Sequence, residues 1–278
     1  MHSPADIDAL LAQHGLAPRR EFGQNFVADP NTVRRIARLA EITATDHVVE
    51  IGPGLGSLTL ALAEVGATVL AIEVDRGVVP VLQAIVADQP NVTVVQADAM
   101  NMDWTSALAG ADTWSMVANL PYNIATPLIC DLLDGVPSIQ RMLVMVQREV
   151  GERMCAAPRA SAYGAVSVKI AYWAQAKIVG IVPPTVFIPR PKVDSALVQI
   201  IRRPAPITSA DPTTMFTLVR TSFGQRRKML RRSLAGIVAP ETFQAAGIDA
   251  QRRPEELGVL EWGALALSHQ AATAVSPT

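Results

Sequence analysis

The chain predicts an α/β fold with a doubly wound, mostly parallel sheet, followed by a small all-α domain. Strand-like apolar runs alternate with helical patterns through most of its 278 residues. Short connections between such elements favour a parallel sheet covered on both faces. Beyond the proline-rich segment Arg203–Asp211 the pattern becomes entirely helical.

Two helices are predicted before the first strand of the sheet. Ser3 caps the first helix, Pro4 lies in its first turn, and Gly15 ends it. The second helix is predicted over Asn31–Ile42, where apolar residues recur at helical spacing and arginines occupy the other face.

The alternating region follows. Its strand-like runs are His47–Ile51, Thr68–Glu73, Val92–Ala97, Trp114–Ala118 and Arg141–Gln147. Helices are predicted between them over Ser57–Val65, Gly77–Asp88 and Thr126–Leu133. A helix over Tyr163–Ala174 precedes two late strands, Lys177–Val182 and Ser195–Arg202. Because a short, turn-rich link joins these two strands, we expect them to pair antiparallel at the edge of the sheet.

A domain boundary is predicted near residue 205, which divides the chain into a larger domain, 1–205, and a small helical domain, 206–278. The helices expected in the smaller domain are Pro212–Ser222, Lys228–Ile237, Pro240–Ala246 and Pro254–Ser268.

The composition limits where this protein works and what it binds. The formal net charge is −1, so nucleic-acid binding would need a local basic patch rather than a basic chain. Cys130 and Cys155 have no metal-ligand spacing and are expected to be reduced thiols. The chain begins without a signal-peptide pattern and has no apolar stretch of membrane-spanning length, which predicts a cytoplasmic protein without metal or membrane.

A glycine-rich loop after the first strand of the sheet predicts a cofactor site. Glycines at alternate positions, including Gly52 and Gly54, allow a sharp turn and a close approach to a ligand. The spacing Gly-x-Gly-x-Gly differs from the dinucleotide fingerprint, which favours a phosphate-free cofactor such as S-adenosylmethionine. Glu73 and Asp98 end the next two strands, where carboxylates can accept hydrogen bonds from ribose hydroxyls and from an adenine amino group.

A second loop predicts a site for a flat base. Asn119-Leu120-Pro121-Tyr122 follows a strand and combines an amide, a rigid turn and an aromatic ring. Such a set can hold a base through its exocyclic amino group while stacking on the ring. Phe187, between two prolines, is expected to supply the opposite aromatic face.

Several further segments, in this order and spacing, carry a resemblance. They are Phe22–Phe26, Glu50–Thr59, Glu73–Asp75, Ala97–Ala99, Asn119–Ile124, Gln147–Val150, Phe187–Ser195 and Arg253–Leu257. The chain resembles the bacterial small-subunit (16S) ribosomal RNA adenine dimethyltransferases, which convert two adjacent adenosines near the 3′ end of that RNA to dimethyladenosines. The resemblance implies a Rossmann-like class I S-adenosylmethionine-dependent methyltransferase.

The resemblance also implies site residues. It places Asn25, Val27 and Gly52 at the methionine part of the cofactor and Asn119 near the reacting methyl group. Val27 stands where the family usually has leucine, a change that a backbone contact tolerates. The implied partner is 16S rRNA within the small subunit or its precursor, and we expect a monomer.

A basic cluster follows Arg220 in the predicted helical domain. Six positive charges occur in thirteen residues with no acid among them: Arg220, Arg226, Arg227, Lys228, Arg231 and Arg232. This density favours a phosphate-binding face with salt-dependent affinity for RNA.

Four alternative functions stay open at this point. One is the related family that dimethylates an adenine of large-subunit (23S) RNA and confers macrolide resistance. A second is an assembly factor for the small subunit that acts mainly without catalysis. A DNA adenine methyltransferase would commonly have a second proline in place of Leu120, and a nicotinamide oxidoreductase would have a third glycine in its fingerprint.

Overall fold

The computed structural model describes residues 1–19 and 21–275, and these divide into two compact units. The first unit comprises Met1–Gly151 and Lys177–Arg202, and the second comprises Glu152–Ala176 and Arg203 onward. Among the described residues, no helix is long and apolar enough to cross a membrane.

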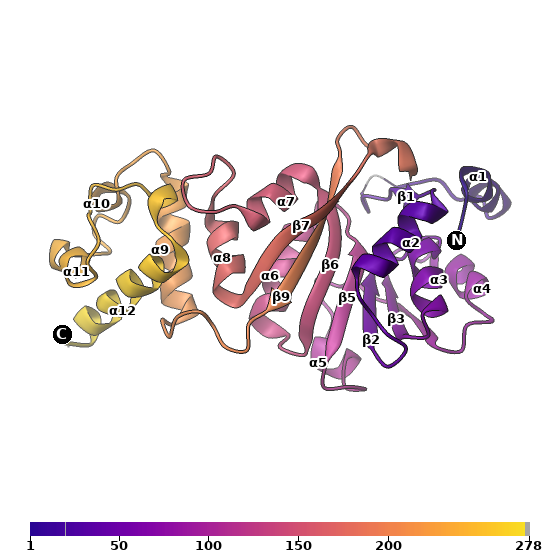
Figure 1. Cartoon of the computed structure of the whole chain (residues 1–278), viewed down its shortest axis with the longest axis horizontal. Helices are drawn as coiled ribbons and strands as arrows, with labels where there is room; N and C mark the ends of the chain where they lie inside the picture. Colours follow the sequence, from indigo (N-terminus) through magenta and orange to yellow (C-terminus); the bar gives the residue numbers. More distant parts are fainter. Residues whose placement is uncertain (20, 276–278) are drawn as a thin grey trace. The chain divides into compact units, whose positions relative to one another are not determined.

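The first unit is built on a seven-stranded sheet (Figure 1). Its strands are β2 (His47–Ile51), β3 (Thr68–Glu73), β4 (Val92–Gln96), β5 (Trp114–Asn119), β6 (Ile139–Gln147), β7 (Ala174–Val182) and β9 (Ser195–Arg202). The order β4-β3-β2-β5-β6-β9-β7 places β2 and β5 side by side at the centre. The pairs from β4 to β6 are parallel, and β9 is antiparallel to β6. The two late strands are therefore neighbours at one edge, as the sequence predicted.

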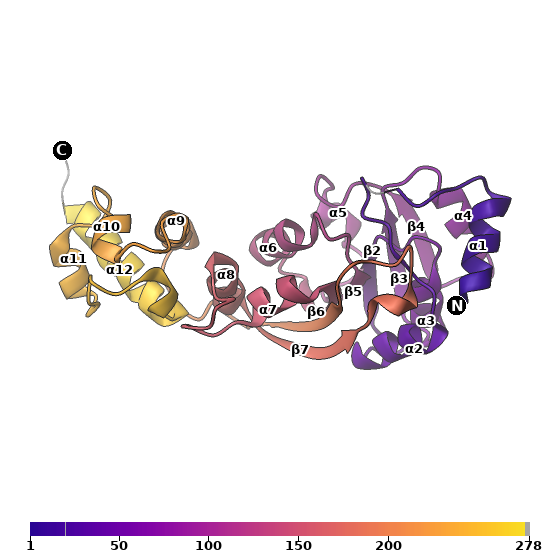
Figure 2. The ribbon, with the colours of Figure 1, turned by 90° about the horizontal axis from the view of Figure 1, so that it is seen from above.

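Helices cover both faces of this sheet (Figure 2). Figure 2 shows α2 (Pro30–Leu39) and α3 (Ser57–Glu64) on one face and α5 (Trp104–Ala107) and α6 (Ala125–Gly135) on the other. The remaining helices of the unit are α1 (Pro4–Gln13), α4 (Val79–Ile85), the start of α7 (Arg148–Cys155) and a 3-10 turn, Pro184–Val186. Apolar residues of α2 and α3 form one buried cluster with residues of β2, β3 and β5, which packs these helices on the sheet.

A two-stranded sheet that the sequence analysis missed lies beside the large sheet. β1 (Phe26–Val27) pairs antiparallel with β8 (Phe187–Ile188), in the register Phe26↔Ile188 and Val27↔Phe187. Strands this short carry no periodicity of their own, since their pairing is decided by contacts between distant parts of the chain.

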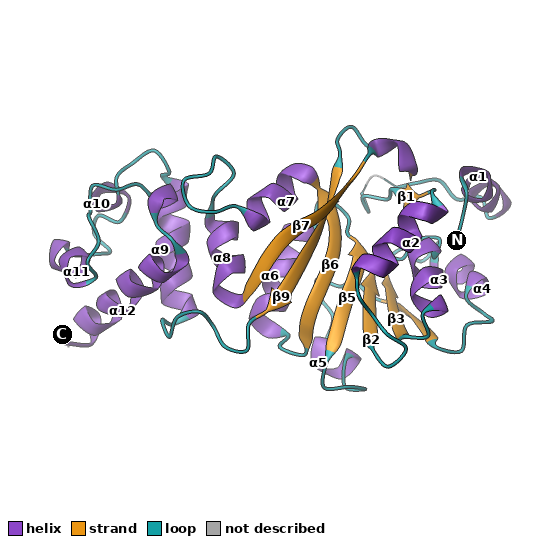
Figure 3. Ribbon diagram, viewed as in Figure 1, coloured by secondary structure: helices purple, strands orange, loops and turns teal. Residues whose placement is uncertain are grey.

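The second unit is helical apart from the start of β7 (Figure 3). Its helices are the end of α7, α8 (Ala165–Trp173), α9 (Pro212–Gly224), α10 (Leu230–Ser233), α11 (Pro240–Ala245), a 3-10 turn at Pro254–Glu256, and α12 (Val259–Val275). Trp262 is fully buried among the apolar side chains of α8, α9 and α12.

The division into units differs from the single boundary predicted near residue 205. The chain changes unit at Arg202, close to that boundary, but residues 152–176 also belong to the second unit. The Tyr163 hydroxyl donates to the Leu257 carbonyl at 2.8 Å, and the Tyr172 hydroxyl donates to the Ala210 carbonyl at 2.9 Å. A helical pattern such as that of α8 predicts an apolar face but does not show which of the two hydrophobic cores that face packs against.

Two predicted helices of the smaller unit are shorter or interrupted. α10 spans only Leu230–Ser233 because the Leu230 and Arg231 amides donate to carbonyls of the loop at Ala250–Arg252, and Gly236 adopts a positive φ of 79°. The predicted helix over Pro254–Ser268 is a 3-10 turn followed by α12. The break lies at Gly258, whose amide donates to the Glu261 carboxylate at 2.8 Å.

Candidate functional site

One pocket, open to solvent, lies at the carboxyl ends of β2, β3 and β5 in the first unit. This edge of an open parallel sheet is where ligands bind in such folds. The predicted residues among its walls are Asn25, Val27, Gly52, Gly54, Glu73, Asp98, Asn119 and Pro121. All predicted cofactor residues therefore lie together around one space, although they come from five separate parts of the chain.

The glycine loop turns because its glycines adopt backbone angles that other residues avoid. Gly52 and Gly54 have φ of 69° and 55°. A Cβ atom on Gly54 would lie 2.8 Å from the Phe26 ring, and one on Gly52 would lie 3.5 Å from Pro121 Cδ. Both glycines are therefore needed for their backbone conformation, and Gly54 is also needed for space, because a Cβ atom there would collide with the Phe26 ring.

The Glu73 carboxylate is buried at the end of β3 and is held by two backbone amides. Its Oε2 accepts from the Gly54 amide at 3.0 Å, and its Oε1 accepts from the Asp75 amide at 2.9 Å. Burial raises the pKa of Glu73, while these two hydrogen bonds oppose the rise. A carboxylate oxygen can accept more than one hydrogen bond, so Glu73 can also accept from a donor on a ligand.

Asp98 lies after β4 and is exposed. Its carboxylate accepts from the Met100 amide at 2.9 Å and from Asn101 Nδ2 at 2.7 Å. These contacts hold the carboxylate on the pocket wall, where it can accept from a donor on the ligand.

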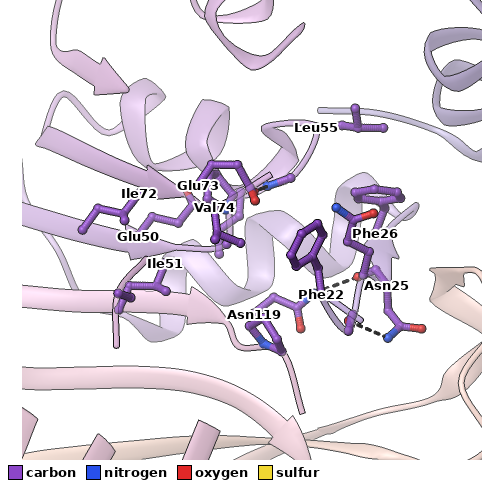
Figure 4. A pocket seen from close by; sticks show the side chains of 18 of the residues that line it. Phe22, Asn25, Phe26, Glu50, Ile51, Leu55, Ile72, Glu73, Val74 and Asn119 are labelled. Atoms are coloured by element: carbon purple, nitrogen blue, oxygen red, sulfur yellow. Dashed lines mark hydrogen bonds between the residues drawn. The ribbon is translucent and has the colours of Figure 1, made fainter. Parts of the chain in front are cut away.

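Asn119 is the last residue of β5, and its amide group has a fixed orientation. Nδ2 donates to the Asn25 carbonyl at 2.9 Å, so the Oδ1 atom is left as an acceptor (Figure 4). Asn25 in turn donates from its own Nδ2 to the Gly23 carbonyl at 3.0 Å. The segment before β1 therefore orients the side-chain amide of Asn119, the first residue of the loop Asn119–Tyr122, called the base loop below.

Tyr122 and Phe187, the two predicted stacking residues, do not line this pocket. Tyr122 is half-buried next to Pro121, and its hydroxyl lies 3.0 Å from Ser195 Oγ. The Phe187 ring is 3% exposed and belongs to the core cluster shared with Val27 and Val33. Phe187 therefore does not supply the second aromatic ring that was expected to stack on the base, because the pairing of β8 with β1 directs its side chain into the core.

Glu50 is a pocket residue that the sequence analysis did not assign. Its side chain is fully buried on the pocket wall, and its Oε2 has no hydrogen-bond partner among the described residues. Burial raises its pKa to about 8, which the nearby Thr59 hydroxyl partly counteracts and the Glu73 carboxylate reinforces. The sequence does contain a signal for Glu50, because an acidic residue stands at the start of the glycine loop.

Phe22 and Val74 also line the pocket and were missed. In Figure 4, Phe22 lies beside Asn119, whereas Val74 lies next to Glu73. Val74 is 40% exposed, which leaves an apolar surface for a flat ligand.

The charges around the pocket discriminate between ligand classes. The described lining residues include three acidic residues, Glu50, Glu73 and Asp98, and no lysine, arginine or histidine. A pyrophosphate would be repelled by this wall, whereas a cationic ligand with hydroxyl and amino groups is favoured. Within the described residues, no group of three or more metal-ligating side chains occurs.

The basic cluster lies in the second unit, and all six of its side chains are exposed. Arg226 differs from the other five because it pairs with Glu255 at 3.6 Å and donates to the Ser161 carbonyl at 3.1 Å. No other member forms an ion pair within the described chain. The acid that neutralises Arg226 lies far along the sequence, so the run alone could not reveal it.

Comparisons with known proteins agree with the fold and with the motifs. The profile of the family described as "Ribosomal RNA adenine dimethylase" matches residues 15–268. A "Ribosomal RNA small subunit methyltransferase A" from Kineococcus radiotolerans is 46% identical over 95% of this chain and 90% of that protein. The protein of the same name from Bifidobacterium adolescentis is 45% identical over 94% of this chain and 92% of that protein.

Solved structures give the same fold class. A dimethyladenosine transferase from Plasmodium falciparum superposes with a TM-score of 0.77 at 22% identity, over 88% of this chain and 97% of that one. The 23S rRNA methyltransferase ErmE superposes with a TM-score of 0.67 at 25% identity, over 88% of this chain and 99% of that one. The Rossmann-like methyltransferase fold is confirmed. The large-subunit alternative is not favoured, since relatives with nearly twice that identity are named for the small subunit.

Proposed function

The chain belongs to the ribosomal RNA adenine dimethylase family, and on that premise we propose that it dimethylates two adjacent adenosines near the 3′ end of 16S rRNA. The methyl donor is S-adenosylmethionine, and each methyl group is transferred to the exocyclic amino nitrogen of the adenine. The orientation of Asn119 carries this proposal. Because its Nδ2 donates to the Asn25 carbonyl at 2.9 Å, the Oδ1 atom of this pocket residue is left as the acceptor for an amino group.

The pocket suits this cofactor in shape and charge. The loop at Gly52 and Gly54 lets the cofactor approach the main chain closely. Glu73 accepts hydrogen bonds from the ribose hydroxyls, and Asp98 accepts one from the adenine amino group. Asn25, Val27 and Gly52 contact its methionine part. The orphaned, buried Glu50 Oε2 supports a cationic ligand, because a positive charge nearby favours the ionised carboxylate.

The bound cofactor supplies an activated methyl group on a sulfonium. The residues of this chain align the acceptor with it. An adenine amino nitrogen is a weak nucleophile because its lone pair is delocalised into the ring. Asn119 Oδ1 and a backbone carbonyl of the loop accept the two amino hydrogens, which moves the nitrogen towards tetrahedral geometry and aims its lone pair at the methyl carbon. Alignment of this kind contributes up to ~7–11 kcal/mol in favourable cases.

Pro121 and Tyr122 complete the base site. Pro121 stiffens the turn that follows β5. In space it lies close to Gly52 of the glycine loop and to Gly23 of the segment before β1. Tyr122 stacks on the flipped base, a contact worth about 1–3 kcal/mol. Burial raises the pKa of the Tyr122 phenol, and its hydrogen bond to Ser195 partly opposes the rise.

The exposed basic cluster of the second unit binds RNA phosphates. Arg220, Arg227, Lys228, Arg231 and Arg232 are available for this role, whereas Arg226 holds the local fold through Glu255. The partner is 16S rRNA in the small ribosomal subunit or its precursor, in the cytoplasm, and the chain acts as a monomer.

The test uses labelled S-adenosylmethionine with small subunits that lack the 3′-end dimethyladenosines, with large subunits and DNA in parallel. We expect label on the small subunit alone, at two adjacent dimethylated adenosines. Label on the large subunit or on DNA would overturn the assignment. Tight subunit binding without any label, with a fresh cofactor preparation, would instead identify a non-catalytic assembly factor.

A further inference from the structure

The segment Phe187–Ser195 is the longest motif to which the proposed function gives no role. In the structure its two ends lie in different sheets. Phe187 and Ile188 form β8, and Ser195 is the first residue of β9. Ser195 is fully buried, although serine is a polar residue and such residues need a hydrogen-bond partner when buried.

That partner is the aromatic residue of the base loop. Ser195 Oγ lies 3.0 Å from the Tyr122 hydroxyl. The two residues are 73 positions apart in the chain, so only the tertiary fold brings them together. We propose that Ser195 is a positioning residue for methyl transfer, because its hydroxyl holds the far end of the Tyr122 ring in the place where that ring stacks on the target adenine.

Ser195 is a rigid anchor for this purpose. It stands opposite Gln147 in the antiparallel ladder of β6 and β9, and the preceding residue, Asp194, accepts the Arg148 amide through its carbonyl at 2.9 Å. The Tyr122 backbone, in contrast, lies in a turn outside any helix or strand. A ring held only by this turn could swing about its side-chain torsions. A second point of attachment at the hydroxyl restricts the ring to one lateral position.

This inference rests on the proposed stacking role of Tyr122, and it assigns Ser195 no contact with the substrate. Its effect on the reaction runs through alignment. We therefore expect it in turnover rather than in cofactor affinity, because Tyr122 and Ser195 do not line the cofactor pocket.

The experiment is a double-mutant cycle with Tyr122→Phe, Ser195→Ala and the two combined. Each variant is assayed with labelled S-adenosylmethionine on small subunits lacking the dimethyladenosines, which gives kcat and the KM for subunits. Cofactor Kd is measured by calorimetry and Tm by thermal unfolding. Each single change should lower kcat about fivefold, the effect of one net hydrogen bond, with cofactor Kd unchanged. The combined variant should be no slower than either single one.

Two further variants make the outcome decisive. Ser195→Thr keeps a hydroxyl and should restore most of the turnover, whereas Ser115→Ala in β5 is the matched control and should behave as the parent. If Ser195→Ala also lowers Tm, its loss of kcat has to be judged from Tyr122→Phe instead. That variant removes the same hydrogen bond but leaves the core intact, and it should show the same loss in kcat.

Unchanged kcat in Ser195→Ala, or losses that multiply in the combined variant, would overturn the inference. The Tyr122→Ala variant separates this failure from that of the proposed function. If Tyr122→Ala leaves kcat unchanged, then the stacking role itself is wrong. If it lowers kcat while Ser195→Ala does not, then only the positioning role is wrong.

Discussion

The Glu50 and Glu73 carboxylates are both buried at the ends of neighbouring strands, yet their surroundings differ. Glu73 accepts two backbone amides, whereas one oxygen of Glu50 has no partner among the described residues. A buried carboxylate without donors holds its proton more tightly, while one with donors is more easily ionised. Two neighbouring acids can thus serve one ligand in different ways.

The raised pKa of Glu50 predicts a pH dependence of stability. The unfolded chain loses this proton near pH 4.5 and the folded chain near pH 8. Between these values the folded state binds the extra proton, so the free energy of unfolding falls as pH rises, by up to about 1.4 kcal/mol per pH unit. The Glu50→Gln variant should lack this contribution and gain stability over the parent towards pH 8. Urea unfolding of both proteins across this range measures it, and parallel pH profiles would contradict it.

Glu73 predicts a separation of cofactor binding from RNA binding. Glu73→Ala removes the proposed acceptor for the ribose and the contact that holds the glycine loop through the Gly54 amide, so cofactor Kd should rise at least tenfold. Binding of small subunits should persist, since no part of the basic cluster is near this strand in the chain. Calorimetry with the cofactor and a subunit-binding assay measure the two effects. Equal loss of both affinities would refute the ribose role.

At the scale of elements, strands were easier to predict than helices. β2, β3 and β9 have the predicted bounds because continuous apolar runs are typical of strands buried on both faces. α5 and α7 were missed, since the first is a single turn and the second is largely polar. The β1–β8 pair was also missed, although it closes the pocket wall next to Val27.

The segment before β1 is tied across the pocket by one buried acid. Asp75, after β3, accepts from Gln24 Nε2 at 2.9 Å and pairs with Arg19 at 3.5 Å. It also accepts from the Gly77 amide at 2.9 Å. The cofactor wall at Glu73 and the segment that orients Asn119 are therefore joined through this side chain.

Asp75→Ala should release this segment and accelerate cofactor dissociation about tenfold, because charge-assisted hydrogen bonds of this kind are lost together. Turnover at saturating cofactor should change less than the Kd. Stopped-flow measurement of cofactor release tests this, with Asp88→Ala, an exposed acid elsewhere in the unit, as control. A dissociation rate equal to that of the control would show that the segment is held by other contacts.

At the scale of the whole molecule, charge is distributed unevenly between the two units. The chain has 24 basic and 25 acidic residues, so its balance does not itself attract RNA. Three carboxylates surround the pocket of the first unit, and six exposed basic residues cluster in the second. The proposed cofactor site and the proposed RNA-binding face thus lie in different units.

The basic cluster predicts a change in salt dependence. Replacing Arg227, Lys228 and Arg231 together by alanine should weaken subunit binding and reduce the slope of log K against log salt by about two, given ~0.7 per phosphate contact on single strands. Arg226→Ala is the contrasting variant. Because Arg226 pairs with Glu255, the Arg226→Ala variant should lower Tm more than the triple variant does and should reduce the salt slope less. A triple variant with the parental slope would remove this face from the RNA interface.

Within the pocket, the sequence by itself determined that the predicted cofactor residues meet, but not that Glu50, Phe22 and Val74 join them. The predicted cofactor residues Gly52, Glu73 and Asn119 stand at the ends of apolar strands, and parallel strands bring their carboxyl ends to one edge. The order of the motifs likewise determined the family. These features are local, because apolar runs, glycines and strand ends are written in consecutive residues.

Only the tertiary structure decided the contacts between distant segments. It placed Phe187 in the core rather than against a base, joined Ser195 to Tyr122, paired Arg226 with Glu255, and assigned residues 152–176 to the helical unit. Each of these depends on which surface a segment packs against. That choice is made by burial and hydrogen bonding across the whole fold, and a local pattern carries no record of it.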